Sequence, residues 1–141
     1  MAPIVQQILV GVLSLTLLCV EGSIAMGPDG TGLFDTFDGK PKRDLVFELC
    51  AAADYVLALG TCASYGGITA APPNPTAAVG LQYADGQPGG LLGKDWRSAK
   101  GLPVVNVAVF ALLIEGVPFT VSVNACGALA PTVFVAVKVM A

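Results

Sequence analysis

The sequence predicts an α/β fold built on parallel strands, and three observations lead to this prediction. Continuous apolar runs at Leu15–Val20, Tyr55–Leu59 and Leu102–Val107 have the length and character of buried parallel strands. A segment with helical spacing, from Arg43 to Asp54, lies between the first two runs. Strand, helix and strand in this order form a βαβ unit, for which a right-handed crossover is expected.

Residues 4–20 form an apolar stretch that polar residues and a glycine interrupt. A signal peptide would need a positively charged start, but no Lys or Arg precedes Lys40. A membrane span would need about 20 apolar residues, and Glu21 ends this stretch early. We therefore expect a short helical turn over Val5, Leu9 and Val12, then the first strand, and no direct membrane insertion.

Two turn-rich segments separate the first strand from the helix. Residues 27–32 combine Pro-Asp-Gly with repeated glycines, which is typical of a loop, and they match no phosphate-binding pattern. The second segment ends in Pro41, which suits the first turn of the helix that follows. On the apolar face of that helix, Cys50 is expected to pack as a small hydrophobic side chain.

A long irregular segment, residues 70–93, follows the second strand. Unstructured loops of this length are uncommon in a compact domain, and they are usually functional or covered by a partner. Asp95, Trp96 and Arg97 come next and include the only tryptophan of the chain. Because Trp and Arg are enriched at interfaces, this group is either an interface anchor or a structural plug of the loop.

The composition indicates one domain with an unusually apolar surface. The chain has 141 residues, of which 12 % are charged and 55 % are hydrophobic. A soluble domain usually has about 25 % charged residues, so we expect that a partner covers much of the surface or that the chain is incomplete. The net charge of −3 argues against nucleic acid as a partner, since no Lys/Arg stripe is available to neutralise phosphates.

The chain has no histidine. This excludes Cys-His and Ser-His nucleophile pairs as well as His-ligated zinc. The cysteines show no C-x-x-C pair and no regular spacing, which argues against a disulfide framework and for a reducing compartment. They are Cys19, Cys50, Cys62 and Cys126. A four-cysteine cluster or zinc site is possible only if the fold brings all four side chains together.

Cys62 lies where the second strand ends. The apolar run stops at Gly60, and Thr61, Cys62 and further small residues follow. Open α/β sheets bind ligands at the carboxyl ends of their strands, and small residues let the backbone approach a bulky group. We expect an edge loop, residues 60–67, that presents Cys62. Glu21, at the end of the first strand, either serves a site or solvates a turn.

Several segments match one protein family in order and spacing, over roughly residues 15–108. They are Leu18-Cys19-Val20-Glu21-Gly22-Ser23-Ile24, Gly27-Pro28-Asp29-Gly30-Thr31-Gly32, Ala58-Leu59-Gly60-Thr61-Cys62-Ala63-Ser64-Tyr65-Gly66-Gly67-Ile68, Pro73-Asn74-Pro75-Thr76, Gly80-Leu81-Gln82-Tyr83, Gly89-Gly90-Leu91-Leu92-Gly93-Lys94-Asp95, and Arg97 through Ala108. Together they resemble the small subunit of nickel–iron hydrogenases, most of all its regulatory (hydrogen-sensing) and cyanobacterial-type uptake groups.

The resemblance implies a flavodoxin-like domain over residues 1–108, with a partial parallel sheet in three layers and long loops. It implies a proximal 4Fe-4S cluster that faces the nickel–iron site of a large subunit and passes electrons toward a redox acceptor or sensor protein. Cys62 would be one thiolate ligand, with Gly60 and Thr61 in the cluster-binding turn and Glu21 beside it. The groups that it resembles lack an export signal on this subunit, which agrees with a cytoplasmic location.

The sequence also departs from the family pattern. The family's first strand carries a Cys-x-x-Cys pair, and this chain starts after that point. Where the family has Gly-Cys-Pro, Ala108 is followed by Val109-Phe110-Ala111. Three of the four proximal ligands are therefore absent from matching positions. Residues 109–141 form a divergent apolar tail, typical of a reading-frame shift or a divergent fragment, and Cys126 within it is not assigned as a ligand.

Three alternatives accompany the prediction of an electron-transfer subunit. The first is a truncated or frame-shifted fragment without a complete cluster site. The second is a flavodoxin-like module that binds a nucleotide or flavin, although no phosphate fingerprint supports it. The third is a cysteine-nucleophile enzyme with a strand-to-helix turn at Cys62, which lacks the histidine that a Cys-His mechanism needs.

Overall fold

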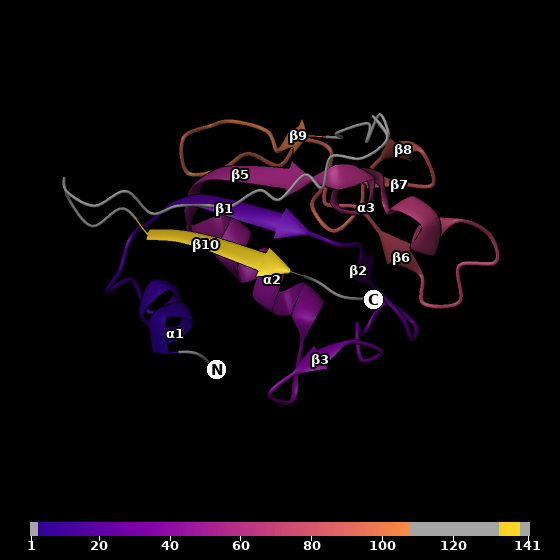
Figure 1. Ribbon diagram of the computed structural model, residues 1–141, viewed down its shortest axis with the longest axis horizontal. Coiled ribbons are helices and arrows are strands. Elements are labelled where there is room, and N and C mark those ends of the chain that lie inside the picture. The colour runs from indigo at the N-terminus through magenta and orange to yellow at the C-terminus, as the bar shows by residue number, and fades with distance from the viewer. Residues whose placement is uncertain (1–2, 108–132, 139–141) are drawn as a thin grey trace, which may run out of the picture.

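The centre of the structure is a four-stranded parallel sheet (Figure 1). The computed structural model describes residues 3–107 and 133–138. The strand order is β10-β1-β5-β9, and all three pairings are parallel. The strands are β1 (Leu15–Glu21), β5 (Ala53–Leu59), β9 (Val105–Val107) and β10 (Val133–Lys138). The prediction of an α/β fold on a parallel sheet is confirmed.

One helix, α2 (Lys42–Ala52), connects β1 to β5 and packs against the sheet. It ends two residues before the predicted boundary, so that Asp54 belongs to β5. The chain turns from helix to strand at Ala53, which has an extended backbone and donates its N–H to the carbonyl of Cys50. This immediate change brings β5 alongside β1 without a separate loop.

The face of the sheet that α2 covers is fully apolar and buried. Leu18 and Val20 of β1 lie beside Val56 and Ala58 of β5 in the register, and each is at most 1 % exposed. They join one core cluster with the buried side of α2, which consists of Leu45, Val46, Leu49 and Cys50. Alternate residues of both strands thus supply the core, as expected for a sheet packed against a helix.

The amino-terminal stretch folds into a short helix, α1 (Pro3–Leu9), which precedes β1. The predicted helical turn included Val12, but Val12 lies after the helix and is 76 % exposed. Ile8 is buried in the core, and Val5 and Leu9 pack against it. α1 contacts α2 and thus extends the helical layer on that side of the sheet. Among the described residues, no helix is long and apolar enough to cross a membrane.

The third predicted strand is shorter than expected, because only Val105–Val107 forms β9. Pro103 has no N–H for a sheet ladder, and the N–H of Val104 donates to Oε1 of Gln82 at 3.0 Å. Gln82 also donates from Nε2 to the carbonyls of Gly93 and Trp96, both at 3.3 Å. This buried amide therefore ties the start of β9 to the long segment before it.

The long irregular segment contains short strands and a 3₁₀-helix that the sequence did not predict. η1 (Gly67–Ala70) and β6 (Ala78–Val79) contact each other, and β6 pairs with β2 (Ile24–Ala25). A hairpin follows, formed by β7 (Tyr83–Ala84) and β8 (Gln87–Pro88). Trp96 packs against the core while partly buried, which favours the structural plug over the interface anchor.

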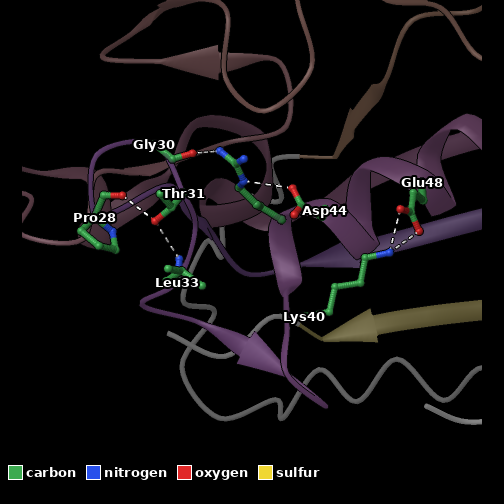
Figure 2. A network of polar contacts seen from close by, with 8 residues as sticks. Pro28, Gly30, Thr31, Leu33, Lys40, Asp44 and Glu48 are labelled. Carbon is green, nitrogen blue, oxygen red and sulfur yellow. Dashed lines mark hydrogen bonds and ion pairs between the residues drawn. The ribbon is translucent and has the colours of Figure 1, made fainter.

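The glycine-rich residues 27–32 form a loop that is held by protein groups (Figure 2). Arg43 donates to the carbonyl of Gly30 and, from Nε, to Asp44 at 3.0 Å. Thr31 donates to the carbonyl of Pro28 at 2.6 Å and accepts the N–H of Leu33 at 3.4 Å. These contacts fit the predicted loop rather than a phosphate cradle.

A second hairpin leads from this loop into α2. It pairs β3 (Thr36–Phe37) with β4 (Lys40–Pro41), and Lys40 forms an ion pair with Glu48 at 2.6 Å (Figure 2). Pro41 lies one position before the helix rather than in its first turn. The predicted divergent tail, residues 109–141, lies outside the described residues except for the backbone of β10.

Replacement of Leu49 by Ala tests the packing between α2 and the sheet. Leu49 is 1 % exposed, so its loss leaves a cavity, and we expect the free energy of unfolding to fall by about 2–5 kcal/mol. Phe47→Ala on the exposed side of the same helix is the matched control, with an expected change within about 0.5 kcal/mol. Urea denaturation measures both, and equal losses would contradict this packing.

Candidate functional site

The segment after β5 is a short helix, α3 (Gly60–Tyr65), and not the edge loop predicted over residues 60–67. Gly60 has φ +79°, a value that L side chains rarely adopt, and the chain turns there from strand into helix. Cys62 lies in the first turn of α3, and its carbonyl accepts the N–H of Gly66 at 2.9 Å. Half-buried Gly60 and Cys62 flank Thr61, which is exposed.

The backbone approaches the thiol of Cys62 closely at Gly67. A Cβ on Gly67 would lie 2.6 Å from Sγ and 3.0 Å from Cα of Cys62, and Gly67 has φ +58°. No other residue type fits this position without displacement of the cysteine. The sequence-based expectation that small residues let the backbone close in on Cys62 agrees with this geometry.

The carboxyl ends of β1 and β5 lie side by side, because Glu21 pairs with Leu59 in the register. Glu21 is exposed, one register position before the turn that leads to Cys62. The loop that follows β1 is tied to η1 by a hydrogen bond of 2.5 Å between the hydroxyls of Ser23 and Thr69. Two of the sheet's carboxyl-end connections are therefore joined, while a role for Glu21 at a site stays a prediction.

Among the residues that the structure describes, Cys19 and Cys50 do not join Cys62 in a metal site. Cys50 is fully buried beneath the sheet, and burial raises the pKa of its thiol to about 12, as expected for a packing role. Burial also raises the pKa of Cys19, which is half-buried within β1. Across residues 3–107 and 133–138 no group of three or more Cys, Asp or Glu residues could hold a metal ion. Cys126 lies outside these ranges.

Two buried polar side chains near this edge were not predicted as functional residues from the sequence. The hydroxyl of Ser64 on α3 and Oδ1 of Asn106 on β9 are buried, with no hydrogen-bond partner among the described residues. α3 and β9 are in contact. Buried polar atoms are usually paired, and no motif or spacing in the sequence singled out these two.

Comparisons with known proteins identify the family of the chain. The sequence matches the family described as NADH ubiquinone oxidoreductase, 20 Kd subunit, over residues 6–138. The chain belongs to this family. The match extends over β10, which forms the edge of the sheet beside β1.

Hydrogenase small subunits are among the relatives of the chain, which confirms the resemblance found in the sequence. The F420 non-reducing hydrogenase II small subunit of Methanosarcina mazei is 42 % identical over 55 residues, which are 39 % of this chain and 14 % of that protein. The uptake hydrogenase small subunit of Azotobacter chroococcum is 43 % identical over 63 residues, which are 45 % of this chain and 17 % of that protein.

A solved structure supports the same family and the same fold. The actinobacterial-type NiFe-hydrogenase from Ralstonia eutropha H16 matches with a TM-score of 0.55 and 32 % identity. The match covers 74 % of this chain and 30 % of that chain. The chain thus spans only a small part of the length of these proteins.

Gly67→Ala tests the close approach of the backbone to Cys62. We expect the free energy of unfolding to fall by more than the roughly 1–3 kcal/mol of a strained backbone alone, because the new Cβ also meets Sγ. Gly86→Ala is the matched control, since Gly86 has φ +71° and open space around its Cβ. Thermal or urea unfolding measures both variants, and equal effects would mean that the contact with Cys62 is unimportant.

The buried thiol of Cys50 predicts a dependence of stability on alkaline pH. Its pKa is about 12 when folded against an ordinary 9.0, so the folded state disfavours the thiolate. Its contribution to stability is complete below pH 9 and is lost as the pH rises toward 12. Cys50→Ala should therefore lose less stability than the natural chain across this window in urea titrations. Parallel declines would contradict the assignment.

Proposed function

We propose that this chain is the electron-transfer small subunit of a nickel–iron hydrogenase and that Cys62 is one thiolate ligand of its proximal 4Fe-4S cluster. The observation that carries the proposal is the position of Cys62 in the first turn of α3, at the carboxyl edge of the parallel sheet. Open α/β sheets bind their ligands at this edge. The hydrogenase small subunits among the relatives support the electron-transfer role.

The surroundings of Cys62 are compatible with a bulky inorganic group on one side. Its side chain is half-buried, and Gly66 and Gly67 follow within the same turn region. A bound iron–sulfur cluster would supply one-electron transfer, with a potential set by its thiolate ligands and by nearby hydrogen bonds. Gly60 and Thr61 would form the turn that holds Cys62, with Glu21 beside it on β1.

The described residues do not form a complete four-thiolate site, because Cys62 has no partner ligands among them. This observation favours a second candidate function, a subunit of the same family that lacks a complete cluster site. The two candidates differ in iron content and agree in fold. No described contact of the glycine-rich loop, residues 27–32, favours the alternative of a flavodoxin-like module that binds a nucleotide.

The partners follow from the proposal. A hydrogenase small subunit requires a large subunit, which would carry the nickel–iron centre and oxidise H2, and it requires an electron acceptor or sensor protein. Exposed apolar side chains on η1 and in the loop after β2, namely Ile68, Leu33 and Phe34, are consistent with a surface that another protein covers. We place the complex in the cytoplasm as part of the same proposal.

Cys62→Ser tests the cluster ligand. The chain is co-expressed with a nickel–iron large subunit, reconstituted anaerobically with iron and sulfide, and assayed for iron per chain and for an EPR signal after reduction. The natural chain should retain cluster iron and Cys62→Ser should lose most of it. Cys19→Ser is the matched control, because Cys19 is also half-buried but lies within β1, and it should keep the iron.

Two outcomes would change the proposal. Equal iron in all three proteins would remove Cys62 from the ligand set. No iron in any of them, together with stable co-purification with the large subunit, would favour the second candidate, a family member without a complete cluster site.

A further inference from the structure

The loop before β9 carries three positive charges that no carboxylate of the described residues neutralises. Lys94, Arg97 and Lys100 are all exposed. None of their side chains forms an ion pair within the part of the chain that the structure describes. Asp95 is the only acidic residue in this stretch. We call residues 94–100 the basic loop.

The other cationic side chains that the structure describes lie within residues 40–43, and each of them pairs with a carboxylate. Lys40 lies 2.6 Å from Glu48. Lys42 lies 2.6 Å from Asp35. The whole chain has a net charge of −3. The basic loop is therefore a local positive patch on an acidic chain.

The basic loop is held in a defined turn by its backbone and by the core. The N–H of Trp96 donates to the carbonyl of Gly93 at 2.9 Å, and the Trp96 side chain packs against the core. Ser98 is buried, and its N–H donates to the carbonyl of Leu102 at 2.8 Å. The Ser98 hydroxyl accepts the N–H of Lys100 at 3.2 Å. A surface fixed in this way loses little conformational entropy when a partner binds.

The basic loop lies at the amino end of β5, away from Cys62. The N–H of Ala99 donates to the carbonyl of Ala53, the first residue of β5, at 3.4 Å. Cys62 follows the other end of β5, and a strand of this length spans roughly 20 Å. In Figure 1 the chain before β9 turns near the start of β5, and α3 lies beyond the other end of that strand. A partner on the basic loop therefore leaves the edge at Cys62 free.

The surroundings of the basic loop favour a protein as its partner. Leu102 is 43 % exposed, and Pro103 beside it is exposed as well. Protein interfaces combine such apolar contacts with a polar rim. A nucleic acid or an anionic membrane is an extended negative surface, which the remaining acidic residues of the chain would repel. An acidic patch on a protein can match the basic loop alone.

We propose that the basic loop is a docking surface for a protein partner that carries a complementary acidic patch. Complementary charges accelerate the encounter of two proteins and fix their relative orientation. The apolar residues that follow the loop would lie at the border of the same contact. The proposal does not depend on cluster binding at Cys62, so that the iron content of the chain does not decide it.

Binding of a fluorescein-labelled oligoglutamate peptide to the full chain tests this proposal. Lys94→Gln combined with Lys100→Gln removes two charges, while Arg97 is kept because it donates to the carbonyl of Trp96 in the loop backbone. Lys40→Gln combined with Lys42→Gln is the matched control, with the same change in net charge at two paired lysines. At low ionic strength we expect the loop variant to weaken binding about tenfold and the control less than about twofold.

The possible outcomes are distinct. Peptide binding that declines with added salt and withstands the control substitutions would support the proposal. No saturable binding, or equal weakening by both variants, would overturn it. A DNA duplex and vesicles of phosphatidylglycerol and phosphatidylcholine serve as parallel probes. Tighter binding of either probe than of the peptide, lost in the loop variant, would assign the surface to phosphate groups and overturn the proposal too.

Folding of each variant is checked by protection of the buried Cys50 from maleimide. If the double loop variant exposes Cys50, Lys94→Gln alone replaces it, with an expected weakening of peptide binding by about threefold. An unchanged affinity of this single variant would then contradict the proposal.

Discussion

The structure depends on the parallel pairing of β1 with β5 over the apolar side of α2. Leu18 and Val20 lie beside Val56 and Ala58, and all four are buried. This packing fixes the register, because a shift by one residue would bring the alternate side chains, such as exposed Tyr55, into the core. The same register sets the ends of both strands level, so that Glu21 lies beside Leu59 and the turn to Cys62 begins at a defined place.

Two glycines determine the backbone conformation after the end of β5. Gly60 turns the strand into a helix with a positive φ, and Gly67 brings the backbone against the sulfur of Cys62. The cysteine is therefore held in one place by backbone rather than by long side chains. A side chain whose position is set by the backbone suits the ligand role proposed for Cys62.

The sequence was sufficient for β1, β5 and part of β9, for α2 and for the packing role of Cys50, because continuous apolar runs and a helical period carry this information directly. It did not predict β10 or the short strands of the long segment. It missed α3, since its segment of small residues resembles a loop and its first turn is set by the φ of Gly60. It also missed Gln82, whose three hydrogen bonds join segments that are close only in the fold. The ligand role of Cys62 stays a prediction from family resemblance and position.

The strand order has a consequence for how the chain acquires this fold. β1 lies in the interior of the sheet, yet its neighbour on one side is β10, the last strand that the structure describes. During synthesis β1 can pair with β5 early, but its other edge keeps unpaired backbone groups until residues 133–138 have been made. Such an open edge is a template for pairing with other chains. Pairing with β10 therefore covers an edge of β1 that would otherwise be open to other chains.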